Sequence, residues 1–166
     1  MVICYRKKMI RIAQIWFEET GAGGGEKADI AFCHGIREPQ KGPFRLVQTF
    51  HSRFSDLTLP EETLFLQISK TGRNEVRRSE KDGTQREFFD SRALTERPDV
   101  LEGLAEMYRR MYASKGREAS LNAEQMRAYA GTGALYCSRG RKDGEDLVYH
   151  SYLADRTCAR RLHSVS

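Results

Sequence analysis

The last 33 residues constrain the fold most, because they read as three consecutive strands. Segments 134–138 and 145–153 are rich in apolar and aromatic residues, and RGRKDG joins them through Asp143-Gly144, a pair that favours a two-residue hairpin turn. A third strand is predicted over 159–165, up to the end of the sequence. Strands joined in this way are antiparallel and need a second layer that buries one of their faces.

Three helices are predicted upstream of this hairpin. The first starts at a capping box, Thr58-Leu-Pro-Glu61, and runs to about Asp82, with Gly83 after it. The second spans about 98–115 and carries apolar residues at helical spacing, and the third is short and begins at Asn122.

The remaining segments predict strands and one loop. TGAGGGEK at 20–27 is a flexible loop, because its glycines have no side chains to bury. Alternating or β-branched residues predict strands over 9–17, 29–33, 44–54 and 84–90. The expected fold class is thus α/β (α+β), with a mixed, largely antiparallel sheet and three helices.

Length and composition indicate one domain at 1–166. The 39% apolar residues are enough for a core, and the 31% charged residues predict an ionic surface with a net charge of +5. The four cysteines form no C-x-x-C pair and are expected to be reduced, which is typical of a cytoplasmic protein. No segment approaches the roughly 20 apolar residues that span a bilayer.

A cationic stripe runs along the second half of the first predicted helix. On a helical wheel its basic residues gather opposite Leu64, Ile68 and Val76. They are Lys70, Arg73, Arg77, Arg78 and Lys81. Such a stripe can follow a diphosphate or a nucleic-acid backbone, and the alternative is an ordinary solvated face.

Candidate chemistry in the hairpin centres on Tyr149, His150 and Tyr152. On a strand, His150 and Tyr152 point to one side and Tyr149 to the other. His150 has the near-neutral pKa that a general base needs, although a strand histidine is also common as a core residue. The four histidines lack metal-ligand spacing, so no metal is assigned.

Two segments resemble the FemAB-like branch of the GNAT (acyl-CoA N-acyltransferase) superfamily. Residues 69–83, SKTGRNEVRRSEKDG, follow Asp56-Leu57 and match a helix that reads about Arg-x-x-Ile-Arg-Arg-Ala-Glu-Lys-x-Gly in that group. Residues 131–138, 147–155 and 159–166 are similar to its central hairpin, with a His-x-Tyr strand followed by Arg-Leu-Leu-His-Ser. Asn74 and Ser79 depart from the pattern, and the likeness covers about residues 44–166.

This resemblance implies an N-acyltransferase that moves an acyl or aminoacyl group to an amine of a sugar- or peptide-linked acceptor, such as a bacterial cell-wall precursor. The donor is acyl-CoA or aminoacyl-tRNA. His150 and Tyr152 are the catalytic candidates, and Lys70, Arg73, Arg77, Arg78 and Tyr149 are the candidate substrate-binding residues.

The resemblance also implies further strands and a helix beyond the hairpin, so the domain is expected to be truncated and inactive if its second half is required. The pyrophosphate loop of GNAT enzymes is missing, since its nearest match, Arg141–Gly144, falls in the predicted turn. The alternative reading is a non-catalytic basic module that binds nucleic acid or another polyanion through the helix face at 70–81.

Overall fold

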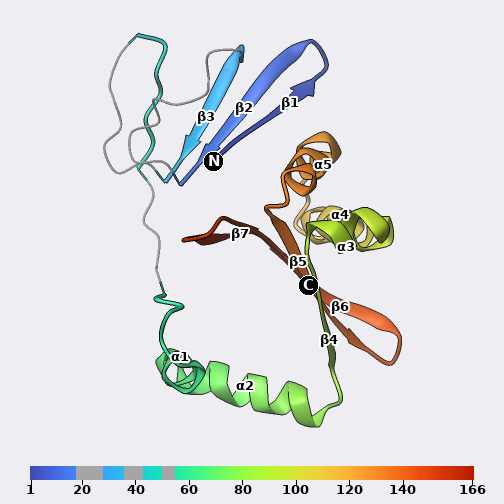
Figure 1. Ribbon diagram of the computed structural model, residues 1–166. Helices are drawn as coiled ribbons and strands as arrows, with labels where there is room; N and C mark the ends of the chain where they lie inside the picture. Colours follow the sequence, from blue (N-terminus) through green and yellow to red (C-terminus); the bar gives the residue numbers. More distant parts are fainter. Residues whose placement is uncertain (18–27, 36–42, 50–54) are drawn as a thin grey trace. The chain divides into compact units, whose positions relative to one another are not determined.

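The computed structural model describes residues 1–17, 28–35, 43–49 and 55–166. Over these residues the protein is a mixed α+β structure with two sheets and five helices (Figure 1), which confirms the predicted class at that level. It divides into two compact units, one formed by residues 1–41 and 86–166 and the other by residues 42–85. The loop predicted at 20–27 lies outside the described residues.

The first unit opens with a three-stranded sheet. Its strands are β1 (Val2–Lys7), β2 (Ile10–Trp16) and β3 (Ile30–His34), in that order. β1 pairs antiparallel with β2, and β2 pairs parallel with β3. The strands predicted at 9–17 and 29–33 are confirmed. β1 was not predicted, because the basic residues Arg6 and Lys7 interrupt its apolar pattern.

A second, four-stranded sheet contains β4 (Gln85–Phe89), β5 (Leu135–Lys142), β6 (Glu145–Ala154) and β7 (Ala159–Val165), in that order. The β5–β6 and β6–β7 pairs are antiparallel. Between β5 and β6, Asp143 and Gly144 both adopt positive φ, at 52° and 84°, as a type I′ turn requires. The predicted hairpin and the strand at 84–90 are confirmed.

Helices α3 (Ser91–Glu96), α4 (Pro98–Ala113) and α5 (Ala123–Gly131) pack against this sheet. Side-chain caps set two of the starts: the Asp90 carboxylate accepts from the Ala93 amide at 2.8 Å, and the Asn122 amide oxygen accepts from the amides of Glu124 and Gln125. α4 and α5 confirm two predicted helices. α3 was missed, since six residues are too few to show a helical period.

One continuous core lies between these helices and the sheet, and it extends to the first sheet through α5 and β1. The indole of Trp16 meets the ring of Tyr129 edge-on, with centroids 6.3 Å apart. The most deeply buried side chains include Leu94, Val100, Leu104, Leu135, Cys137, Tyr149 and Leu153.

The second unit corrects the predicted helix at 58–82. Two helices stand there, α1 (Glu61–Gln67) and α2 (Lys70–Lys81). The chain is extended at Ile68, with ψ of 142°, and the Ser69 hydroxyl accepts from the Gly72 amide at 3.1 Å. A serine that satisfies a free amide in this way starts a new helix, so the long helix is interrupted.

The proposed capping box is also wrong. α1 starts after Pro60, and the Thr58 hydroxyl donates to Asp56 Oδ1 at 2.6 Å instead of capping a helix amide. The predicted end is right, because Gly83 has φ of 71° and its amide donates to the carbonyl of Glu80. The Thr84 amide donates to the backbone carbonyl of Ser79, which completes a Schellman motif.

The strand predicted at 44–54 is not observed in its described part. Residues 43–49 form no strand, and residues 50–54 lie outside the described chain. Phe44 and Leu46 are almost fully exposed, so the apolar residues of this segment do not pair into either sheet.

Candidate functional site

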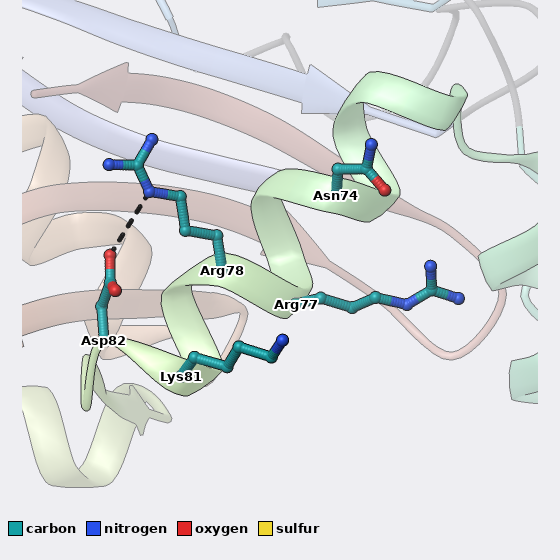
Figure 2. Close-up of a pocket in the computed structure, with 5 residues that line it drawn as sticks. All are labelled: Asn74, Arg77, Arg78, Lys81 and Asp82. Carbon is teal, nitrogen blue, oxygen red and sulfur yellow. Dashed lines mark ion pairs between the residues drawn. The ribbon is translucent and has the colours of Figure 1, made fainter.

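Helix α2 carries the cationic residues that the sequence singled out. Arg77 and Arg78 lie on one turn and Lys81 on the next, and with Asn74 and Asp82 they line a hollow of about 350 Å³ (Figure 2). All five residues belong to α2 and its carboxyl-terminal cap. The hollow is therefore a depression between neighbouring side chains of one helix, and three of the five residues that line it are cationic.

The basic residues of α2 differ in their contacts. Arg78 pairs with Asp82 at 3.5 Å, an exposed i,i+4 pair that stabilises little. The Arg77 guanidinium lies 5.5 Å from the centroid of the Phe65 ring. Arg73 donates from Nη1 to the carbonyls of Leu66 and Ile68, so it closes the carboxyl end of α1.

These contacts show that the predicted phosphate-binding residues of α2 do not form one group. Arg73 uses a guanidinium nitrogen to hold the corner between the two helices, whereas the hollow is lined by Arg77 and Arg78. Lys70 is the first residue of α2, directly after the Ser69 cap. It lies about two turns from Arg77 along the helix.

The second group of candidates lies on β6, and its strand alternation is as predicted. Tyr149 is 1% exposed and points into the core, where its hydroxyl donates to Asp146 Oδ2 at 2.5 Å. Burial raises the pKa of Tyr149 to about 12, and the hydrogen bond to Asp146 acts in the same direction. Tyr149 thus faces α4, on the opposite side from the two catalytic candidates.

His150 and Tyr152 lie on the other face of β6, with ring centroids 6.2 Å apart. Both are partly exposed. Burial lowers the pKa of His150, and the nearby charge of Arg161 lowers it further. Nδ1 of His150 is buried and forms no hydrogen bond with the described residues.

An ionic network around Arg139 was not predicted. The Arg139 side chain is 5% exposed and pairs with Glu87 at 2.7 Å, while Asp99 and Asp146 lie 3.7 and 3.9 Å away. It also lies 5.4 Å from the centroid of the Phe89 ring. The alternation Leu135, Cys137 places Arg139 on the buried face, but the predicted strand stopped one residue before it.

This network ties β4, β5, β6 and the start of α4 together. Hydrogen bonding to Arg139 lowers the pKa of Glu87, and hydrogen bonding to Arg97 lowers the pKa of Asp99. The carboxylates remain partly exposed, so the buried charge of Arg139 itself is the group that depends on these partners.

A second hollow, of about 420 Å³, lies between α4 and the β5–β6 hairpin. It is lined by Gly103, Glu106, Met107, Arg110, Glu145, Asp146 and Tyr149. Glu106 pairs with Arg109 at 2.7 Å and Asp146 with Arg141 at 2.8 Å, so two of its three carboxylates already have cationic partners. Within the described ranges, no group of three or more His, Cys, Asp or Glu side chains is placed to hold a metal ion.

One serine and one histidine are in direct contact. The Ser151 hydroxyl lies 2.8 Å from Nδ1 of His163, but Ser151 is completely buried. The ring of Tyr108 meets His163 edge-on, with centroids 5.6 Å apart. The pair belongs to the core and has no access for a substrate at the serine oxygen.

Comparison of the chain with protein-family models, curated proteins and solved structures gives no match. In the described part of the chain, no helix has both the length and the apolar character needed to cross a membrane.

Proposed function

We propose that this protein is an N-acyltransferase of the FemAB/GNAT type, which transfers an acyl or aminoacyl group to an amine of a sugar- or peptide-linked acceptor. The proposal rests on the resemblance of residues 69–83 and 131–166 and on one structural observation. His150 lies on the partly exposed face of β6 beside Tyr152, and its pKa is lowered, so the neutral ring predominates at pH 7.

In this proposal the acceptor amine attacks the carbonyl carbon of an activated acyl donor directly. A C–N bond forms, the bond to the leaving thiol or ribose oxygen breaks, and the amine proton passes to Nε2 of His150. This requires the His150 tautomer with its hydrogen on Nδ1. The Tyr152 hydroxyl, on the same face, is the candidate donor to the leaving group or to the developing oxyanion.

GNAT enzymes bind the pyrophosphate of acyl-CoA through a loop whose nearest match in this sequence is Arg141–Gly144. Arg141–Gly144 forms a hairpin turn, and Arg141 donates to the Gly144 carbonyl at 2.9 Å rather than standing before a helix. No pyrophosphate contact is therefore assigned to this segment. Arg77 and Arg78, which line the α2 hollow, are the candidates for binding a phosphate-bearing substrate.

The test is transfer of a labelled group from acyl-CoA or aminoacyl-tRNA to amine acceptors by the purified chain. His150→Gln is expected to reduce the rate at least about 100-fold, as loss of a general base does. Native activity should persist at pH 6.5 and fall only at lower pH, since the pKa of His150 lies below the ordinary histidine value and the protonated ring cannot accept a proton. This acid limb should vanish in His150→Gln.

Tyr112→Phe, on α4, is the matched control and should retain full activity. Absence of transfer from both donors would remove the support for this function, as would an unchanged acid limb in His150→Gln.

A second candidate function is binding of a polyanion through α2, favoured by the hollow at Arg77, Arg78 and Lys81. Affinity for duplex DNA or tripolyphosphate should fall steeply with salt and be lost in Arg77→Ala/Arg78→Ala/Lys81→Ala. Arg92→Ala, which removes an exposed arginine of α3, is the control. Equal losses in both variants would count against a specific role for α2.

A further inference from the structure

The two faces of the four-stranded sheet differ in what they carry. One face supplies the core, with Leu135, Cys137 and Leu153 fully buried. The opposite face is not packed in the same way: Phe88 is 66% exposed, and Tyr136 and Tyr152 are both partly exposed. Aromatic rings left at the surface of a sheet are available for contact with a planar ligand.

These rings come from three neighbouring strands and lie next to one another. Phe88 on β4 and Tyr136 on β5 stack with centroids 5.8 Å apart and planes at 24°. Tyr136 pairs directly with Tyr152 across the β5–β6 ladder, so the two share a face. His150, two residues before Tyr152, adds a fourth ring to this row.

The charge at the edge of this row is positive. Arg161 on β7 pairs with Tyr152 in the sheet register and is exposed. Its charge contributes to lowering the pKa of His150, so it lies close to the rings. The strand positions that flank the rings on this face are Ser138 and Ser164, both in register with His150, and neither is acidic.

We propose that this aromatic face, formed by Phe88, Tyr136, His150, Tyr152 and Arg161, binds single-stranded nucleic acid by stacking its bases. Several rings on adjacent strands fit successive unpaired bases, and Arg161 offers a cation for a backbone phosphate. A duplex keeps its bases stacked internally and gains nothing from the rings. The rings and Arg161 belong to the first unit, whereas the cationic residues of α2 belong to the second and have no aromatic residue among them.

The experiment measures binding of fluorescein-labelled oligo(U) by fluorescence anisotropy with the full chain. Phe88→Leu and Tyr136→Leu are each expected to weaken binding roughly tenfold, because a leucine keeps apolar bulk and loses the stacking plane. Phe44→Leu is the matched control: it removes an exposed phenylalanine from the other unit and should leave binding unchanged. The melting temperature of each variant establishes that the fold is retained.

Competition identifies the ligand class. Unlabelled oligo(U) should displace the probe, while an equal phosphate concentration of duplex DNA, tripolyphosphate or AMP should displace it far less. Equal competition by tripolyphosphate or duplex would show that the face binds any polyanion through charge. Equal competition by AMP would show that it binds a single nucleotide. Each result overturns the proposal. Unchanged affinity in Phe88→Leu/Tyr136→Leu would also overturn it. So would a concentration-dependent dimer that Phe88→Leu dissociates, because the face would then be a contact with a second copy of the chain. None of these readings depends on acyl transfer.

Discussion

At the scale of single residues, one glycine of the first unit lies directly against a tyrosine ring. A Cβ added at Gly103 on α4 would lie 2.3 Å from the hydroxyl oxygen of Tyr149 and 2.9 Å from the carbon that bears it. Gly103 therefore lets the Tyr149 ring lie against the helix, where its hydroxyl reaches Asp146. The tyrosine is 1% exposed, and moving its ring aside would disturb the hydrogen bond to Asp146.

Gly103→Ala is expected to lower the free energy of unfolding by about 1–3 kcal/mol, the usual cost of overpacking a core. The measurement is urea denaturation of the full chain. Gly131→Ala is the control, since nothing lies within 4 Å of a Cβ at that helical position. It should be as stable as the native chain or up to about 1 kcal/mol more stable, because alanine favours a helix more than glycine does. Equal stability of the two variants would show that the tyrosine shifts without cost.

At the scale of elements, the break between α1 and α2 depends on local hydrogen bonds. Ser69 supplies an acceptor to the Gly72 amide, and Arg73 supplies a donor to the Leu66 and Ile68 carbonyls. Free amides at a helix start and free carbonyls at a helix end are the groups that such side chains satisfy. Two short helices are thus stabilised where composition alone favours one long helix.

Ser69→Ala is expected to destabilise α2 by about 1 kcal/mol, because the Gly72 amide loses its acceptor. Amide hydrogen exchange over residues 70–81 should then be roughly fivefold faster. Thr58→Ala should leave exchange in α1 unchanged, since Thr58 bonds to Asp56 and caps no helix. Faster amide exchange of α1 in Thr58→Ala would show that Thr58 does cap α1, contrary to the structure.

At the scale of the whole molecule, three partly buried histidines link folding to pH. Burial lowers the pKa of His34 to about 4 and also lowers the pKa of His150 and His163. His34 is further held by stacking on Trp16, with centroids 3.8 Å apart, and by a contact of 2.6 Å to Gln14. Each ring is neutral in the folded chain and takes up a proton more readily once unfolded.

The stability contributed by these rings is present above about pH 6.5, the usual histidine pKa, and is lost as the pH falls toward the folded value. The urea midpoint should therefore decrease from pH 7.5 to pH 5.5, above the range in which most carboxylates titrate. His34→Gln should make this decrease smaller. A midpoint that stays constant over that interval would show that the three rings are no harder to protonate in the folded chain.

Most patterns confined to a few neighbouring residues were predicted well, although the capping box at Thr58–Glu61 was wrong. The Asp143-Gly144 turn, the Asn122 cap and the Gly83 helix end all need only local backbone geometry, and all three are observed. β1 and α3 were missed, since one is interrupted by charge and the other is too short for a period. For the candidate site, the alternation of side chains along the strand predicted that Tyr149 faces away from His150 and Tyr152. The Arg139 network could not be predicted in this way, because it joins residues from elements far apart in the sequence.

The sequence by itself determined the mixed α+β class, the hairpin and the cationic helix face, because turns, caps and periodicity are short-range properties of the chain. Only the tertiary structure decided that Arg139 is buried among carboxylates, that Arg73 closes the corner of α1, and that Phe88 stacks on Tyr136. Those contacts depend on which strands become neighbours and which face the helices cover, and these are set by packing of the core as a whole.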